Sequence, residues 1–150
     1  MHSPAIEAAR AAVDRYRLPL LLAAIYDGLL GLIFLFLADP IFRALGIDLG
    51  ANLIYAQLAA GLIAIMGYGF YLAWRDPLLN GDIVLLGAVF KAFYILLALY
   101  ALARGELPHG LFLIFAAIDV IFLIVFVLHL RDAVVVRTAM ASLVGERAAR

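Results

Sequence analysis

The apolar run 83-IVLLGAVFKAFYILLALYALA-103 decides the fold, because it is long enough to cross a bilayer and yet carries a charge, Lys91, near its centre. About 20 apolar residues in a helix span the ~30 Å hydrocarbon core of a membrane. Three further runs of this kind stand at about 18–38, 53–74 and 111–130. The sequence therefore predicts an all-α, integral membrane four-helix bundle.

The composition agrees with this fold class. Hydrophobic residues make up 68% of the chain, charged residues 15%, and the mean hydropathy is +1.12, whereas soluble domains are about 45 to 50% apolar. We expect an N-terminal segment at 1–17, a transmembrane domain at 18–130 and a C-terminal tail at 131–150. The tail mixes valines with arginines, so that it either continues the fourth helix or lies along anionic lipid.

Basic residues are distributed unevenly over the segments that flank the four runs. One set of flanks holds eight arginines and the other holds two, Arg43 and Arg104. Because cytoplasmic flanks carry the excess of Lys and Arg, this bias predicts an up-down bundle with both termini in the cytoplasm. We expect residues 41–52, on the other side, to form a short interfacial helix ended by Gly46 or Gly50.

Several classes of site are disfavoured by the composition. The net charge of zero argues against nucleic acid binding. The absence of Cys removes thiolate metal sites. His109 and His129 stand near opposite ends of the fourth run and His2 lies in the N-terminal segment, so we read all three as interfacial and predict no metal and no cofactor. Phosphate-loop, zinc-protease and nucleophile-elbow motifs are also absent from the sequence.

Three ionisable residues stand near the middle of three different runs: Asp27, Lys91 and Asp119. Counted from the cytoplasmic ends at about 1.5 Å per residue, their depths are roughly 15, 14 and 18 Å. Charges at bilayer depth normally face one another, a ligand or water. We therefore expect Lys91 to pair with Asp119 and Asp27 to complete a triad, in which one carboxyl holds a proton or meets a cation.

The neighbours of the triad follow helical spacings. Tyr94 shares a face with Lys91, and Tyr68 adds hydrogen-bonding capacity on the second run, so both join the predicted ligand or proton site. An aromatic stripe on the fourth run surrounds Asp119, and packing is its simplest explanation: it comprises Phe112, Phe115, Phe122 and Phe126. Small residues on the first two runs predict close helix packing: Ala24, Gly28, Gly31, Ala56, Ala60 and Ala64. The four prolines that flank the runs are placed where no span should kink: Pro19, Pro40, Pro77 and Pro108.

The sequence is also similar to a group of small four-span bacterial membrane proteins of no established activity. The residues that carry this likeness are Arg75-Asp76-Pro77, Gly87, Lys91, Tyr100, the segment 104–108 and Asp119. The chain more loosely resembles the DoxX-like superfamily, which implies a four-helix fold in a bacterial inner membrane and, from some of its members, service to quinone-linked redox complexes. Phe34, Leu35, Phe36 and Leu37 stand where that family carries a His and Lys cluster, so no family site residue is transferred.

Three functions remain open for such a chain. The first is binding or transport of a small molecule or proton at a protonatable midplane site. The second is a non-enzymatic accessory or oligomer-forming protein, in which the charges only lock the helices together. The third and least favoured is a lipid or isoprenoid enzyme with Lys91 as base and an aspartate as acid. The expected partners are membrane lipids and either a homo-oligomer or a larger membrane complex.

Overall fold

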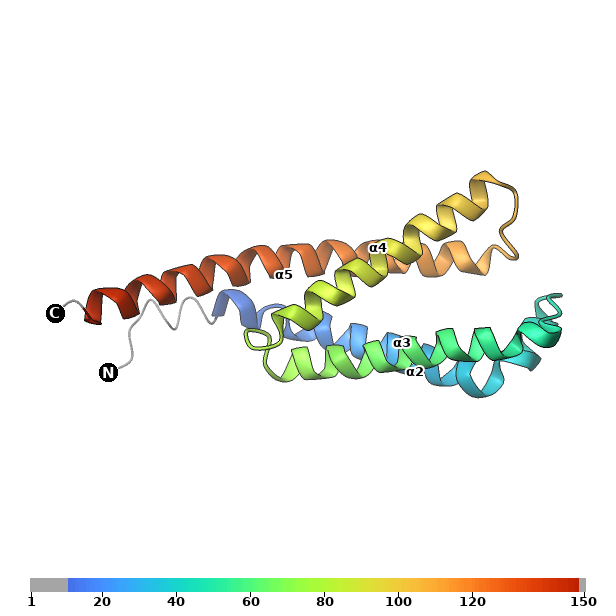
Figure 1. The fold of residues 1–150 in the computed structure, drawn as a ribbon, viewed down its shortest axis with the longest axis horizontal. Helices are drawn as coiled ribbons and strands as arrows, with labels where there is room; N and C mark the ends of the chain where they lie inside the picture. Colours follow the sequence, from blue (N-terminus) through green and yellow to red (C-terminus); the bar gives the residue numbers. More distant parts are fainter. Residues whose placement is uncertain (1–10, 149–150) are drawn as a thin grey trace.

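The computed structural model describes residues 11–148, apart from the side chains of most residues after Thr138, and the described chain is helical with no strand. Its elements are α2 (Arg17–Ala44), the short 3-10 helix η1 (Gly50–Asn52), α3 (Leu53–Arg75), α4 (Gly81–Ala103) and α5 (Leu111–Ala148) (Figure 1). His2 and most of the predicted segment 1–17 lie outside the described residues.

Four helices are long and apolar enough to cross a membrane, which confirms the predicted fold class at that level. Large apolar side chains also cover the outside of the bundle, and Leu18, Phe36 and Leu96 are each about two-thirds or more exposed, at 65%, 74% and 66%. A water-soluble monomer rarely exposes continuous apolar surface on this scale. The exposed surface therefore suits hydrocarbon rather than water.

Helices α2 and α3 pack closely along their lengths, as their small residues predict. A Cβ atom built on Gly31 would lie 2.7 Å from the backbone oxygen of Ala60, and one built on Gly67 would lie 2.7 Å from the Cα atom of Gly28. The two backbones therefore approach so closely that only glycine fits at these positions. The side chain of Gln57 also crosses the interface and donates to the carbonyl oxygen of Leu35 at 3.2 Å.

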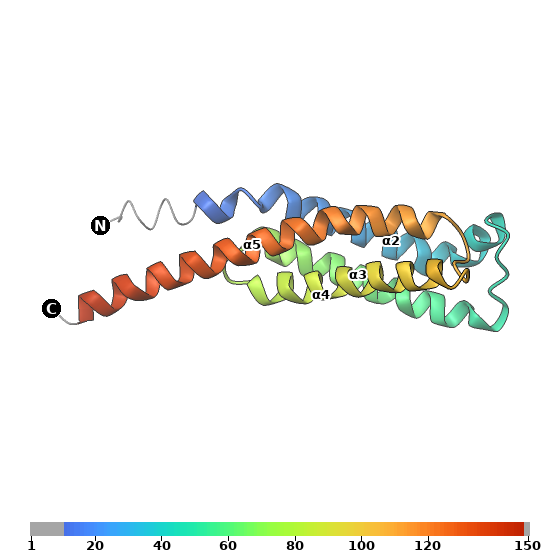
Figure 2. The same ribbon diagram turned by 90° about the horizontal axis from the view of Figure 1, so that it is seen from above.

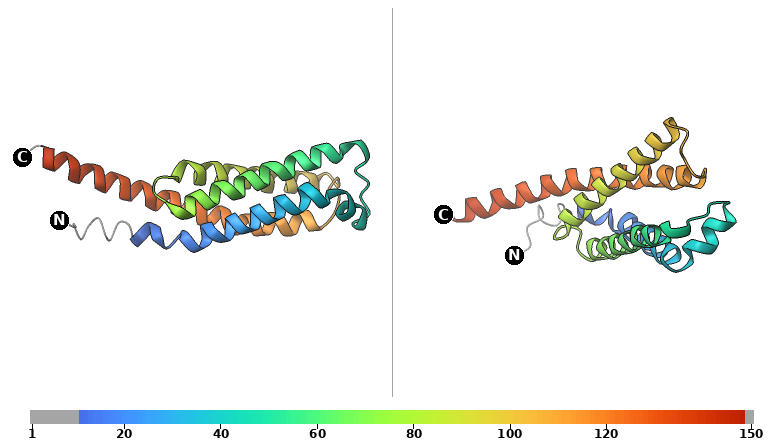
Figure 3. Two further views of the ribbon diagram at one scale, coloured as in Figure 1. Left: turned by 90° about the horizontal axis from the view of Figure 1, so that it is seen from below. Right: turned by 45° about the vertical axis from the view of Figure 1, so that its right-hand side comes forward.

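Helices α4 and α5 form the second packed pair, and the two pairs meet at one end of the bundle. The buried core lies at that end, where Leu20, Phe70, Val84 and Phe126 are all fully covered. Towards the other end α4 diverges from α3, so that the second pair leans away from the first (Figures 1 and 3). The bundle is therefore tightly packed near Tyr16 and more open near Phe42.

The prediction that no proline would kink a span was wrong for Pro40. Helix α2 runs through this residue to Ala44, and Leu37 departs from helical geometry at φ −120° and ψ 18°. Proline has no N–H to donate and its ring collides with the preceding turn, which accounts for a kink about one turn earlier. The helix predicted at 41–52 is in part the segment of α2 beyond this kink, which ends at Ala44 just before Gly46 at φ 75°, one of the two glycines expected to end it; η1 follows as a separate short element.

The C-terminal tail continues the fourth helix, since α5 extends without a break to Ala148. Figure 2 shows α5 projecting well beyond the turn that joins α3 to α4. The projecting part is tied to the residues just before α2 by Asp132, which accepts hydrogen bonds from Arg15 and, at 2.6 Å, from the hydroxyl of Tyr16. Arg137 also donates to the carbonyl oxygen of Leu78 at 2.6 Å.

We expect Asn80→Ala to destabilise the turn between α3 and α4 by about 1 kcal/mol, the usual net value of a hydrogen bond. The Asn80 amide donates to the carbonyl oxygens of Leu72 and Asp76, each at 3.0 Å. Unfolding in mixed detergent micelles measures the change. Asn52→Ala is the matched control, because Asn52 precedes α3 without a capping hydrogen bond from its side chain. Equal effects of the two substitutions would contradict this account of the turn.

Candidate functional site

The structure brings Asp27, Lys91 and Asp119 together from α2, α4 and α5. The Nζ atom of Lys91 lies 2.6 Å from Oδ1 of Asp27 and 2.7 Å from Oδ1 of Asp119. Lys91 is the only lysine in the chain. The similar depths counted along the sequence thus correspond to a contact in three dimensions, and this contact joins one helix pair to the other.

The triad is buried, but its hydrogen bonding is incomplete. Asp27 and Lys91 are each 1% exposed and Asp119 is 5% exposed. Lys91 donates a hydrogen bond to Asp27, whereas its contact with Asp119 lacks hydrogen-bond alignment and Oδ2 of Asp27 has no partner among the described residues. Two carboxylates thus face one ammonium group, with acceptor capacity left over.

Two aromatic rings cover the ammonium group of Lys91. Its Nζ atom lies 5.1 Å from the ring centroid of Tyr26 and 5.7 Å from that of Phe122. Such contacts stabilise a cation that has lost water. Tyr26 was not predicted as a site residue, because neighbouring positions on a helix do not share a face and its place beside Asp27 gave no signal. Its hydroxyl is buried and has no hydrogen-bond partner among the described residues.

The triad borders a pocket of about 450 Å³ between the two helix pairs. A pocket of this volume falls within the usual range for small-molecule sites. Its lining combines the three charged residues with an otherwise largely apolar and aromatic wall: Tyr26, Leu30, Phe34, Phe42, Ala56, Ala59, Ala60, Leu62, Ile63, Phe90, Phe93, Tyr94, Leu97, Phe112 and Phe115.

The charged residues form the floor of this pocket. Along α2, α4 and α5, the triad stands within one residue of the end of the lining nearest Tyr16, and the rest of the lining on these helices continues towards Phe42 and Phe112. Beneath the floor, the rings of Phe70 and Phe126 pack with centroids 4.8 Å apart. A Cβ atom on Gly87 would lie 2.5 Å from the Cζ atom of Phe70, so glycine at 87 allows this ring to close the space below Lys91.

The two sides of the pocket differ. On the side of α2 and α5, a chain of rings closes the wall, with centroid distances of 5.7 Å from Phe34 to Phe42, 6.2 Å from Phe34 to Phe115 and 6.2 Å from Phe42 to Phe112. On the side of α3 and α4, the lining residues Leu62, Phe93 and Leu97 are at least half exposed. The pocket therefore opens between α3 and α4.

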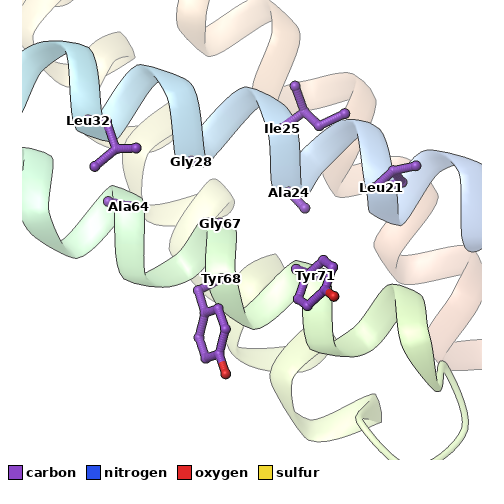
Figure 4. A pocket seen from close by; sticks show the side chains of 9 residues that line it. All are labelled: Leu21, Ala24, Ile25, Gly28, Leu32, Ala64, Gly67, Tyr68 and Tyr71. Atoms are coloured by element: carbon purple, nitrogen blue, oxygen red, sulfur yellow. The ribbon is translucent and has the colours of Figure 1, made fainter.

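The two predicted tyrosines of the site have different positions. Tyr94 lines the pocket, and its hydroxyl donates to the carbonyl oxygen of Phe112 at 3.2 Å. Tyr68 is 63% exposed and does not line the pocket of the triad. Figure 4 shows it projecting away from α2 at a separate groove between α2 and α3, where the small residues of the two helices face one another. The structure therefore brings Tyr94 to the triad but not Tyr68.

The histidines do not join the site. His109 is exposed and its Nδ1 accepts the backbone N–H of Leu111 at 3.0 Å. The side chain of His129 is fully buried, with its ring edge-on to Tyr16 at 5.3 Å. Among residues 11–148, no group of His, Cys, Asp and Glu could hold a metal ion. Comparison of the chain with protein-family models, with curated proteins and with solved structures finds no match.

Proposed function

We propose that the chain is a small polytopic membrane protein that binds or transports a small molecule or a proton at Asp27, Lys91 and Asp119. The observation that carries this proposal is the position of the triad, which forms the floor of an apolar pocket. Charges that served only to fix helix positions would not need an adjoining pocket. A pocket with a few convergent polar groups is the usual form of a ligand site.

The charge balance of the triad supports a role in binding. Fully ionised, it carries a net charge of −1 in a place of low dielectric, where an uncompensated charge is costly. A proton or a cationic ligand would remove this imbalance. The charge imbalance therefore favours binding of a proton or a cation at the triad.

The distribution of arginines supports an up-down bundle with both termini in the cytoplasm, and the membrane that we propose for it is a bacterial inner membrane. Arg15, Arg131 and Arg137 all lie at the end of the bundle near Tyr16. In this orientation, the packed half of the bundle faces the cytoplasm. The pocket then occupies the outer half of the membrane.

A second candidate is the accessory or oligomer-forming role, and one observation favours it. The ion pairs of Lys91 connect α2 to α4 and α5, whereas most other contacts of these helices are within each pair. The triad can thus lock the two pairs together without any ligand. The binding or transport role requires a pocket that a ligand can enter, whereas the accessory role does not.

Filling the pocket tests the proposed function. We expect Ala59→Trp, on the pocket wall, to reduce the amount of small molecule that copurifies with the full chain by about tenfold or more. A loss of about 1.4 kcal/mol in binding free energy is enough to weaken binding tenfold. Native mass spectrometry from lipid nanodiscs measures the bound molecule. Leu58→Trp is the matched control, because Leu58 is 62% exposed and does not line the pocket.

The proton alternative is measured with the same proteins in liposomes. Asp119→Asn should lower the rate of proton flux under an imposed pH gradient, while Asp39→Asn, on an exposed ion pair with Arg43, should not. A wild-type chain that carries no small molecule and passes protons no faster than Asp119→Asn would remove the proposal and leave the accessory role.

A further inference from the structure

The chemistry of the pocket also indicates what kind of molecule it takes. We infer that its occupant is a single-chain amphiphile with an ammonium head, which enters from the lipid between α3 and α4 and places its head against Asp119 and Asp27. This inference rests on the proposed function and names the ligand class for the same site.

The floor favours a cationic donor over other head groups. The ammonium group of Lys91 already contacts both carboxylates, at 2.6 and 2.7 Å, and is covered by the rings of Tyr26 and Phe122. An anionic head would therefore meet two carboxylates and only one shielded amine. An ammonium head would instead bring the net charge of the site to zero and supply N–H donors.

The two carboxylates have acceptor capacity that Lys91 does not use. Oδ2 of Asp27 has no hydrogen-bond partner among the described residues, although Asp27 is 1% exposed and lines the pocket. Oδ1 of Asp119 contacts Lys91 at 2.7 Å without hydrogen-bond alignment, and the Asp119 side chain is the most exposed of the triad, at 7% against 1 and 2%. Asp119 is therefore the residue that an incoming head reaches first.

The walls fit the rest of an amphiphile. Above the floor, the lining consists of Leu, Ile, Ala and aromatic residues, with no charged side chain beyond the triad. The rings of Phe34, Phe42, Phe112 and Phe115 close the side of α2 and α5, while Leu62, Phe93 and Leu97 leave the side of α3 and α4 open to the surrounding lipid. Figure 3 shows the same divergence of α4 from α3. A molecule dissolved in the bilayer can thus reach the triad without crossing water.

A series of probes with one tail and different heads tests this inference. Dodecylamine, dodecyltrimethylammonium, dodecanol and dodecanoate are compared in phosphatidylcholine nanodiscs at equal mole fraction in the bilayer, with native mass spectrometry counting the probe bound per wild-type chain. We expect dodecylamine to bind about tenfold to a hundredfold more tightly than dodecanol, the range expected for hydrogen bonds to a charged group. Dodecyltrimethylammonium, which has the charge but no N–H, should fall between them, and dodecanoate should bind least.

Two variants test whether Asp119 causes the preference for dodecylamine over dodecanol. Asp119→Asn should abolish the advantage of dodecylamine over dodecanol, and Asp39→Asn should leave it unchanged, because Asp39 lies outside the pocket. If dodecanol or dodecanoate binds the wild-type chain as tightly as dodecylamine does, the inference about the head group is overturned. The proposed function still stands in that case if Ala59→Trp blocks the binding. If the wild-type chain binds none of the probes, whether it is a monomer or a dimer that covers the pocket, both the inference and the proposed binding role are wrong.

The entry route is tested by tethering, because the chain contains no cysteine of its own. A bifunctional thiol reagent joins Leu62→Cys to Leu97→Cys across the open side, or Phe42→Cys to Phe112→Cys across the closed side. The first tether should abolish exchange of bound dodecylamine over a time in which the untethered protein exchanges fully, and the second should not. The opposite pattern would contradict entry between α3 and α4.

Discussion

Replacing Lys91 by methionine is expected to cost about 3 to 5 kcal/mol of unfolding free energy, the range found when one partner of a buried ion pair is removed. The two carboxylates that remain would be buried without a counter-ion, since Lys91 contacts both of them and Asp27 is 1% exposed. Titration of the reconstituted chain with denaturing detergent, followed by circular dichroism, measures the loss.

The companion experiment removes all three charges at once. Lys91→Met combined with Asp27→Asn and Asp119→Asn should recover most of the lost stability, because a buried ion pair replaced as a whole is often neutral. Arg43→Met is the control for removal of a cation from an ion pair, since Arg43 pairs with Asp39 on the surface with its side chain 70% exposed. A triple variant as unstable as Lys91→Met alone would show that the lysine matters for reasons other than charge.

Gly31→Ala is expected to separate α2 from α3 and to cost about 2 kcal/mol or more, as overpacking of a tight interface does. The added Cβ atom would lie 2.7 Å from both the Cα atom of Ala64 and the backbone oxygen of Ala60. Neither atom belongs to a flexible side chain that could move aside. The same detergent titration measures the change.

Gly61→Ala is the matched control on the partner helix. A Cβ atom at this position meets nothing within 4 Å. Since alanine is favoured over glycine in a helix by about 1 kcal/mol, this variant should be neutral or slightly more stable. If the two alanine substitutions had the same effect, the close approach of the two backbones would not be what holds the first helix pair together.

The sequence allowed the shared level of the three charged residues along the bundle to be predicted, and their contact confirms it. The rise of a helix is fixed at about 1.5 Å per residue, so the level of Asp27, Lys91 and Asp119 follows from counting alone. The small residues of α2 and α3 predicted close packing for a similarly local reason, because a missing side chain lets a backbone approach wherever a neighbour lies.

The direction of a side chain around its helix axis could not be predicted in the same way. It depends on which helices are neighbours, and the strong pairing of α2 with α3 leaves Tyr68 on an outer groove while Tyr26 turns towards Lys91. The pocket itself arises because the second pair leans away from the first, and no single helix encodes that angle. Tertiary packing likewise decided that α2 continues through Pro40 and that His129 is enclosed.

The most direct test of the central claim uses the fact that Lys91 is the chain's single lysine. Solid-state NMR of the protein in lipid bilayers, with ¹⁵N-labelled lysine and ¹³C-labelled aspartate, measures dipolar coupling between one ζ nitrogen and the eight aspartate carboxyl carbons. We predict strong coupling to two carboxyl carbons, one of which disappears in Asp27→Asn and the other in Asp119→Asn. A ζ nitrogen coupled to no carboxyl carbon would contradict the account.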